Sequence, residues 1–324
     1  MPSRRVIGVD MGGTKLLAGV FDGDLGVHHR VQRTVVGLDQ VTLLTTVQDA
    51  VDELSNSAGR EIAAVGFGIP SLIDRRTGES VISVHLELDH ISFGDVMAER
   101  LGIPVFVDND SNLAALAEHR AGAAVGASEV VVVTVGTGIG GGLILGGQLY
   151  RGWIGAGAEL GHVVIEMDGP PCNGSCPNRG CVEALASGTA LAREAVRIAA
   201  ERPDSALARA RTAGRELAGP LVTELAHDGD EAAREAVQLI GERLGVVVAN
   251  VLNIFNPEIV VIGGGVIAAG ELLLAPARAV VAERVLPFLR ETVPLVAARF
   301  GMEAGMVGAA ALAYDEIARG AGVP

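Results

Sequence analysis

One pattern occurs twice along this chain and constrains its fold more than any other feature. In each copy an apolar strand ends in a glycine loop, and a second apolar strand follows the loop directly. The first copy has an apolar run at residues 5–9 and the loop Gly12-Gly13-Thr14, and the second has a run at residues 130–135 and the loop Gly136-Thr137-Gly138. A repeat of this length in a chain of 324 residues predicts two related domains rather than a solenoid.

Each half of the chain shows the same expected order of elements: a strand meander, a helix, a strand, a helix and a strand. Strands that alternate with helices predict an α/β fold in layers, with ligand loops at the strand ends. Ser111 is the expected N-cap of a helix that runs to about Ala121. Further strands are expected at residues 16–21, 27–35, 62–68, 104–107, 141–145 and 258–262, a hairpin turn at Gly146-Gly147, and helices at 40–58, 303–318 and over most of 182–255.

The two expected domains would enclose a cleft. The small N-terminal domain comprises residues 1–120 together with about 303–324, because the last helix is expected to pack back on it. The large domain comprises residues 121–302 and contains the Ala-rich helical stretch as an insertion.

Three glycine-rich segments are the candidate phosphate-binding loops. Glycines let backbone N–H groups approach phosphate oxygens closely, and such concave nests bind anions. Asp10 precedes the first loop and can hold Mg²⁺, and Lys15 is the one lysine of the chain. Each loop alone is also compatible with a plain turn, but three in repeated contexts favour a nucleotide site. The candidate residues are Asp10, Gly12, Gly13, Thr14, Lys15, Thr137, Gly138, Gly263, Gly264 and Gly265.

The segment Asp108-Asn109-Asp110 follows a buried strand and carries the candidate base. Phosphorylation of a hydroxyl group needs an acceptor for its proton, and a carboxylate can serve. An Asn beside it can orient a sugar hydroxyl by donating and accepting at once. The alternative is that these carboxylates only cap the following helix. We favour the functional interpretation over helix capping.

The three cysteines of the chain, Cys172, Cys176 and Cys181, lie within ten residues of one another and follow His162. An odd, clustered set argues for a metal rather than for disulfides. One imidazole and three thiolates make a closed tetrahedral zinc set, so the zinc would be structural. The alternative of free buried thiols fits this clustering less well.

Two carboxylates flank the cysteine loop. Glu159 precedes His162, and Glu183 follows Cys181. Carboxylates accept hydrogen bonds from sugar hydroxyls, and a zinc site between them would hold both in register. Alternatively, Glu183 merely opens a helix, where negative charge is favourable. The residues alone leave both interpretations open.

Charge and hydropathy exclude some classes of protein. The net charge of −14, with no run of Lys or Arg, disfavours a nucleic-acid partner. No apolar run reaches the roughly 18–20 residues that span a bilayer, so no membrane association is expected. The N-terminus lacks the pattern of a signal peptide, which predicts a cytoplasmic protein.

Taken together, these motifs resemble the ROK family (repressors, open reading frames and kinases), specifically its glucokinase-like members. The resemblance spans nearly the whole chain. The pairing of Glu159-Leu-Gly-His162 with the cysteine loop is its most specific part, whereas glycine motifs are shared by all actin-like kinases. The other matching segments begin at Asp10, Gly68, Val107, Gly136 and Val261.

The resemblance implies an α/β protein of the actin-like (ribonuclease-H-like) ATPase fold that phosphorylates a hexose with ATP and Mg²⁺. It implies that Asp110 is the base and that the chain forms a homodimer or homotetramer. The family's repressors carry an N-terminal helix-turn-helix, which is not expected here because the first strand begins about five residues in. The residues implied to bind the sugar are Gly68, His85, Asn109, Asp110, Glu159, His162 and Glu183, with His162 serving both zinc and sugar.

Two departures from the family pattern leave the substrate open. Three residues separate Cys172 from Cys176, where one is usual, and the sugar loop at residues 85–90 has no Trp. Glucose is the expected hexose, giving glucose 6-phosphate. The alternatives are N-acetylglucosamine, N-acetylmannosamine, fructose or allose, polyphosphate as the donor, a non-catalytic sugar sensor, or an actin-like filament protein.

Overall fold

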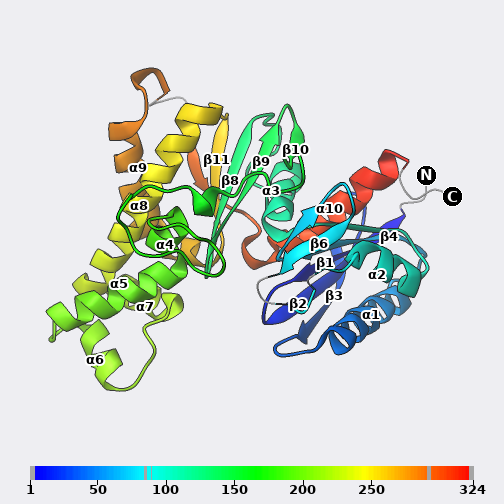
Figure 1. The fold of residues 1–324 in the computed structure, drawn as a ribbon, viewed down its shortest axis with the longest axis horizontal. Helices are drawn as coiled ribbons and strands as arrows, with labels where there is room; N and C mark the ends of the chain where they lie inside the picture. Colours follow the sequence, from blue (N-terminus) through cyan, green and yellow to red (C-terminus); the bar gives the residue numbers. More distant parts are fainter. Residues whose placement is uncertain (1–3, 84–85, 89, 290–292, 321–324) are drawn as a thin grey trace.

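The first of two five-stranded sheets contains the N-terminal strands. The computed structural model describes residues 4–83, 86–88, 90–289 and 293–320 (Figure 1). The strand order is β3-β2-β1-β4-β7, with β1, β2 and β3 antiparallel and β4 and β7 parallel to β1. The strands are β1 (Arg5–Met11), β2 (Lys15–Phe21), β3 (Val27–Thr34), β4 (Ile62–Ile69) and β7 (Val105–Asn109).

The second sheet repeats this topology. Its order is β10-β9-β8-β11-β12, again a meander of three strands followed by two parallel additions on the other side of the first strand. The duplication expected from the two glycine loops is therefore confirmed. The strands are β8 (Val130–Val135), β9 (Ile139–Leu145), β10 (Gln148–Tyr150), β11 (Ile259–Gly263) and β12 (Leu295–Ala297).

Helices cover the outer faces of both sheets. In the first half, α1 buries one face that repeats every three or four residues, including Leu43, Val47 and Leu54, against its sheet. In the second half, α4 to α9 gather on the side of the sheet away from the first domain (Figure 1). The helices are α1 (Gln40–Ser57), α2 (Phe93–Leu101), α4 (Val182–Ala186), α5 (Gly188–Glu201), α6 (Ala206–Thr212), α7 (Gly219–His227), α8 (Glu231–Phe255) and α9 (Glu271–Arg284), with short 3₁₀ helices at Leu160–His162, Gly265–Ala269, Pro287–Leu289 and Gly301–Glu303.

Two further helices, α3 (Asp110–Ala121) and α10 (Ala304–Ala318), join the halves. They pack against each other, α10 on β1 and β4, and α3 on β8 and β9. A Cβ at Gly66 or Gly308 would collide with the backbone of the facing element, so both positions require glycine for this close approach. We propose that the domains divide where α3 ends and where α10 begins.

Two local features differ from the expectations, and a third is confirmed. The N-cap of α3 is Asn109 rather than Ser111, because the Asn109 side chain accepts hydrogen bonds from the backbone N–H groups of Ser111 and Asn112. The glycine turn at Gly146-Gly147 is confirmed, with φ of 58° and 73°. A two-stranded hairpin of β5 (Ser71–Asp74) and β6 (Glu79–Ser83), which the sequence did not reveal, lies beside the first sheet.

Within the described residues, α8 is the one helix long and apolar enough to cross a membrane by length and composition. Just over half of its most apolar window, 56%, is buried inside the protein. It packs against α4, α5, α7 and α9 and thus forms the centre of the second domain's core.

Candidate active site

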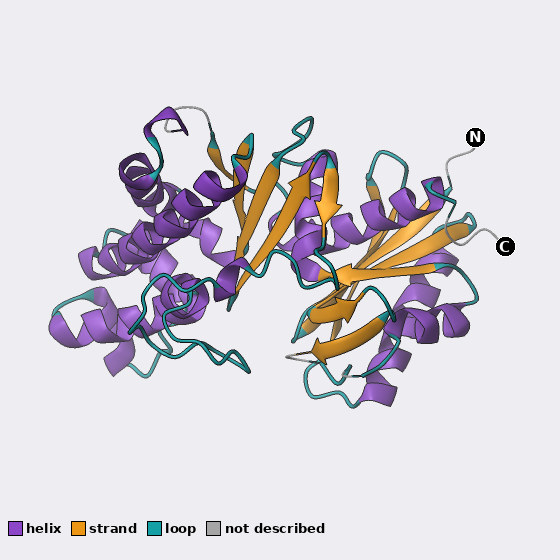
Figure 2. Cartoon of the chain, turned by 45° about the horizontal axis from the view of Figure 1, so that its top comes forward, coloured by secondary structure: helices purple, strands orange, loops and turns teal. Residues whose placement is uncertain are grey.

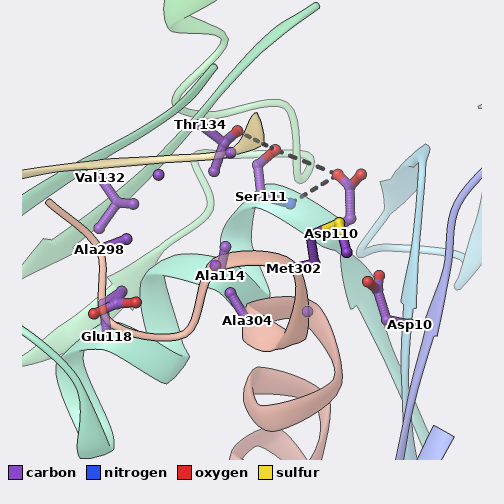
Figure 3. Close-up of a pocket in the computed structure, with 14 residues that line it drawn as sticks. Asp10, Asp110, Ser111, Ala114, Glu118, Val132, Thr134, Ala298, Met302 and Ala304 are labelled. Carbon is purple, nitrogen blue, oxygen red and sulfur yellow. Dashed lines mark hydrogen bonds between the residues drawn. The ribbon is translucent and has the colours of Figure 1, made fainter. Parts of the chain in front are cut away.

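A pocket lies between the two halves, where strand ends from both sheets meet. Asp10 of β1 and Asp110 of α3 lie at one end of it, and Glu118 lies at the other (Figure 3). The second sheet contributes Thr134 at the end of β8 and Gly263 at the end of β11. The topology therefore brings three of the sequence motifs to one place.

Asp110 begins α3 and faces this pocket. Its Oδ1 accepts hydrogen bonds from the backbone N–H of Ser111 at 2.7 Å and from the Ser111 hydroxyl at 3.3 Å. Burial raises the pKa of Asp110, and the hydrogen bonds from Ser111 oppose that rise. The Ser111 hydroxyl also lies 3.3 Å from the Thr134 hydroxyl of the second domain. Because Oδ1 is engaged by Ser111, Oδ2 is the oxygen left to accept a proton.

Asp10 lies at the end of β1, packed against the start of α10 at Gly305. Burial, and then the nearby negative charge of Asp110, raise its pKa to about 7, while Lys15 lowers it. Two buried carboxylates close enough to repel each other favour a cation or a proton between them. Oxygen ligands of this kind suit Mg²⁺, so the residues present fit that ion.

Asp108 has a different environment from Asp110. Its carboxylate forms an ion pair with the Arg151 guanidinium, and it also accepts hydrogen bonds from the Asn112 side chain at 2.9 Å and from the Asn109 backbone at 2.8 Å. Asp108 is therefore fully engaged in holding the start of α3. Arg151, which the sequence analysis missed, is 43 residues away along the chain.

Asn109 caps α3 through its side-chain oxygen, and its amide nitrogen lies 3.5 Å from the Ser71 carbonyl. Gly68 on β4 is paired with Asp10 on one side and Asp108 on the other. Both residues therefore lie at the carboxyl ends of parallel strands, where ligands of α/β sheets bind. His85, the remaining expected sugar ligand of this domain, lies outside the described residues.

The first glycine loop is a tight turn between β1 and β2. The Gly12 N–H donates to the Lys15 carbonyl at 2.9 Å, and the Val35 N–H donates to the Thr14 carbonyl at 3.1 Å. The Lys15 ammonium reaches across to the Met302 sulfur at 3.6 Å, in the segment before α10. Thus Gly12, Gly13 and Thr14 occupy the expected turn, and Lys15 projects beside the pocket.

The second glycine loop is held by the helices that follow the cysteine segment. The Thr137 carbonyl accepts from the Thr189 hydroxyl at 2.8 Å, and the Gly136 carbonyl accepts from the Gly188 N–H at 2.8 Å. At the other end of the loop, Glu183 Oε2 accepts from the Ile139 N–H at 2.9 Å. The Glu183 carboxylate also fills the space beside Gly138 where a Cβ would stand. Glu183 therefore joins the cysteine segment to this glycine loop, a contact that the sequence did not suggest.

The third glycine segment, Gly263-Gly264-Gly265, turns the chain at the end of β11. Gly264 has a φ of 84°, and a Cβ there would collide with the Val135 backbone of β8. Glycine is required because the turn lies directly against the neighbouring strand. Gly263 and Gly264 consequently present bare backbone to the pocket.

His162, Cys172, Cys176 and Cys181 come together, with their possible ligand atoms all within 4.8 Å of one another. The Cys172 sulfur lies 3.5 Å from His162 Nδ1, and the Cys176 sulfur 3.9 Å from that of Cys181. Zn–S bonds of about 2.3 Å at tetrahedral angles place two sulfurs about 3.8 Å apart, so the spacing fits zinc. Burial and the adjacent thiols raise the pKa of Cys172 to about 12, and a bound cation would reverse that effect.

The cluster lies in a segment with little regular structure. Between β10 and α4 the chain is almost entirely loop (Figure 2). This loop carries Glu159, whose pKa is raised by burial first and then by the charge of Glu183, and lowered by His162. The charge of Glu159 in turn raises the pKa of Asp110. Glu159 therefore lies within electrostatic reach of Asp110, His162 and Glu183.

Comparison with known proteins gives consistent results. The model of the ROK family matches residues 6–316. A glucokinase of Thermotoga maritima is 37% identical over 320 residues, covering 98% of this chain and 99% of that protein. A ROK family glucokinase from Streptomyces griseus, solved in complex with glucose and AMPPNP, superposes with a TM-score of 0.85 at 34% identity over 96% of this chain and 99% of the other. A ROK hexokinase from Thermus thermophilus gives a TM-score of 0.79 at 34% identity, over 97% and 99% of the two chains. The expected actin-like ATPase fold is confirmed by these superpositions.

Proposed function

The chain belongs to the ROK family, and we propose that it is an ATP-dependent hexose kinase that converts glucose to glucose 6-phosphate. The observation that carries this proposal is the placement of Asp110. Its carboxylate faces a pocket between the two domains and lies near the Glu159 carboxylate. The ends of β1 and β8, each followed by a glycine loop, line the same pocket. The relatives named glucokinase, at 33–37% identity, support the choice of reaction.

In the proposed reaction the sugar lies against the loop held by the cysteine cluster. Glu159 and Glu183 accept hydrogen bonds from its hydroxyls, the amide of Asn109 donates one, and His162 uses the ring nitrogen that does not face the thiols. Burial raises the pKa of Glu159, so this carboxylate interacts strongly with a hydroxyl donor in a dry site. Zinc at the four-residue cluster would be structural and would hold this loop in place.

The phosphates of ATP lie between the first and second glycine loops in this proposal, with Gly263, Gly264 and Gly265 against the rest of the nucleotide. Gly12, Gly13, Thr14 and Lys15 supply donors on one side, and Thr137 and Gly138 on the other. Bound Mg²⁺ near Asp10 would neutralise phosphate charge. The ion fits there because two mutually repelling carboxylates, Asp10 and Asp110, already favour a cation.

For the chemical step, the sugar hydroxyl oxygen forms a bond to the γ-phosphorus as the bond to the bridging oxygen of ADP breaks. Asp110 accepts the hydroxyl proton at Oδ2, because Oδ1 is held by Ser111. Its raised pKa makes the carboxylate a better proton acceptor than an exposed Asp. Most of the acceleration comes from positioning and from exclusion of water as the domains close.

An assay of ADP release tests the substrate assignment. Purified protein would be supplied with ATP and Mg²⁺ and with glucose, fructose, allose, N-acetylglucosamine or N-acetylmannosamine, and separately with polyphosphate in place of ATP. We expect glucose with ATP to give the highest kcat/KM. Preference for an N-acetylated hexose would keep the mechanism and overturn the substrate. Sugar binding without any turnover would favour the non-catalytic sensor.

We further propose a cytoplasmic location and a homodimer or homotetramer. The three cysteines support the first, because they are free thiols gathered for a metal, and a reducing compartment preserves thiols. The family resemblance supports the second. Light scattering of the purified protein would test the oligomeric state, and a monomer at assay concentrations would contradict it.

A further inference from the structure

A single carboxylate, that of Glu118 in α3, lies where the chain crosses between the two domains. Among the described residues, the chain passes from the first sheet to the second after α3 and returns between β12 and α10. We call residues 122–129 the first crossing and residues 298–303 the second crossing. Glu118 is 1% exposed, and it lies at the end of the pocket opposite Asp110 (Figure 3). The proposed mechanism assigns it no role.

One carboxylate oxygen of Glu118 accepts a hydrogen bond from the first crossing. Oε2 accepts a hydrogen bond from the Ala123 N–H at 2.8 Å, and the Glu118 carbonyl accepts from Gly122 at 3.1 Å and Ala124 at 3.0 Å. A Cβ at Gly122 would collide with Oε2, so the chain has glycine where the carboxylate passes. The turn after α3 is therefore folded around this side chain.

The other oxygen holds the second crossing. Oε1 accepts from the Arg299 N–H at 2.9 Å and from the Phe300 N–H at 3.0 Å. The Arg299 guanidinium donates to the Ala121 carbonyl at 3.0 Å, which ties the same two segments together again. Hydrogen bonds from N–H groups to an ionised carboxylate are about twice as strong as neutral ones. Both crossings are therefore bound to the same carboxylate, that of Glu118.

Short stretches of chain connect Glu118 to the candidate catalytic residues of the pocket. The second crossing continues to Met302, which contacts Lys15, and to Gly305, which packs against Asp10. In the other direction, α3 runs from Glu118 back to Asp110. A shift of either crossing would consequently move the carboxylates of the pocket relative to each other.

We propose that Glu118 is a positioning residue that makes the two crossings rotate as one hinge, and so fixes the geometry reached when the domains close. This inference rests on the proposed function, since domain closure around sugar and nucleotide is what would bring the reactants into line. Without the hydrogen bonds of Glu118, each crossing bends independently. The closed domains then adopt a range of relative orientations instead of one.

The test compares two substitutions at this position. Glu118→Gln keeps the size of the side chain, but its amide oxygen can serve only one crossing, because the NH₂ group faces the N–H donors of the other. Glu118→Ala removes both attachments. The matched control is Glu194→Gln, since Glu194 is a buried carboxylate of α5 paired with Arg197 and Arg243, away from the crossings.

Two quantities would be measured for each protein: kcat and KM for glucose, and the decrease in radius of gyration by small-angle X-ray scattering when glucose and a non-hydrolysable ATP analogue are added. For Glu118→Gln we expect kcat to fall by about tenfold to a hundredfold, since small misplacements have effects of that size. The glucose KM should change much less. The compaction, meaning the decrease in radius of gyration when the ligands are added, should become smaller. Glu194→Gln should lower the melting temperature with wild-type kcat and compaction.

Wild-type kcat and compaction in Glu118→Gln would overturn the inference, and so would a loss of kcat with unchanged compaction. If Glu118→Ala does not fold, Glu118→Gln alone decides. If the wild-type protein compacts with ligands but releases no ADP, the proposed kinase function fails, while the compaction data still decide the role of Glu118.

Discussion

The carboxylate of Asp108 is paired with the guanidinium of Arg151, whereas that of Asp110, two residues later, faces the pocket and accepts hydrogen bonds from Ser111. The strand β7 ends between them, so their side chains point to different surroundings. This contrast separates a structural carboxylate from a candidate catalytic one within one short motif, and it makes the two substitutions distinguishable.

Asp108→Asn should act on stability. The side chains of Asp108 and Arg151 are 8% and 13% exposed, and removing one partner of a buried ion pair costs about 3–5 kcal/mol. Urea denaturation should show a loss of that order, with sugar-dependent turnover retained by the folded fraction. The double variant Asp108→Asn/Arg151→Met should recover part of the loss because it leaves no unpaired charge. Unchanged stability together with lost turnover would contradict this assignment.

Gly140→Ala should disturb the support of Asp110. A Cβ at Gly140 would collide with the Ser111 hydroxyl and lie 2.7 Å from that of Thr134. Overpacking of this kind costs about 1–3 kcal/mol, and displacement of Ser111 should lower kcat by about tenfold. Gly23→Ala is the control, because nothing lies within 4 Å of its added methyl group. Equal kcat for the two variants would show that Ser111 does not support Asp110.

Removal of zinc should weaken nucleotide binding as well as sugar binding. Glu183, two residues after Cys181, accepts a hydrogen bond from the Ile139 N–H in the second glycine loop. Elemental analysis should find about one zinc ion per chain, as four protein ligands imply. Cys181→Ser should lose the metal and show weaker binding of both ligands by calorimetry. Full nucleotide affinity in the zinc-free protein would refute the link through Glu183.

Asp10→Asn should stabilise the ligand-free protein most at high pH. The pKa of Asp10 is about 7 in the folded protein against an ordinary 3.8, so the stability that it contributes is present below about pH 4 and is lost as the pH rises through 7. The difference between a pKa of about 7 and the ordinary 3.8 sets an upper limit of about 4 kcal/mol at pH 8. Urea denaturation should show a gain at pH 8 and less than half of it at pH 5. The exposed Asp52→Asn is the control, and an equal gain for Asp10→Asn at both pH values would contradict the raised pKa.

The sequence predicted most of the fold because its information is local. The apolar runs at β1, β4, β8 and β11 are bounded by turn residues, and the two glycine loops reveal the duplication. The candidate site followed from the same strand ends, which the topology brings together. The N-cap of α3 was misassigned because Asn109 and Ser111 are both good cap residues, and only the backbone geometry distinguishes them.

The remaining site features depend on partners far apart along the chain. Arg151 lies 43 residues from Asp108, Ile139 lies 44 residues from Glu183, and Phe300 lies 182 residues from Glu118. A buried carboxylate that binds backbone N–H groups leaves no pattern in the sequence of its partner, because every residue except proline has that group. Such contacts become visible only when the domains are assembled.

In the proposed reaction, Asp110 accepts the proton of a sugar hydroxyl during phosphoryl transfer. The most direct measurement is glucose-dependent ADP release by wild-type protein and by Asp110→Asn, together with glucose binding by calorimetry. We predict that Asp110→Asn lowers kcat by about 10²–10⁴ while glucose binds with nearly unchanged affinity, because the amide keeps the shape but cannot take the proton. Wild-type turnover in Asp110→Asn would contradict the account.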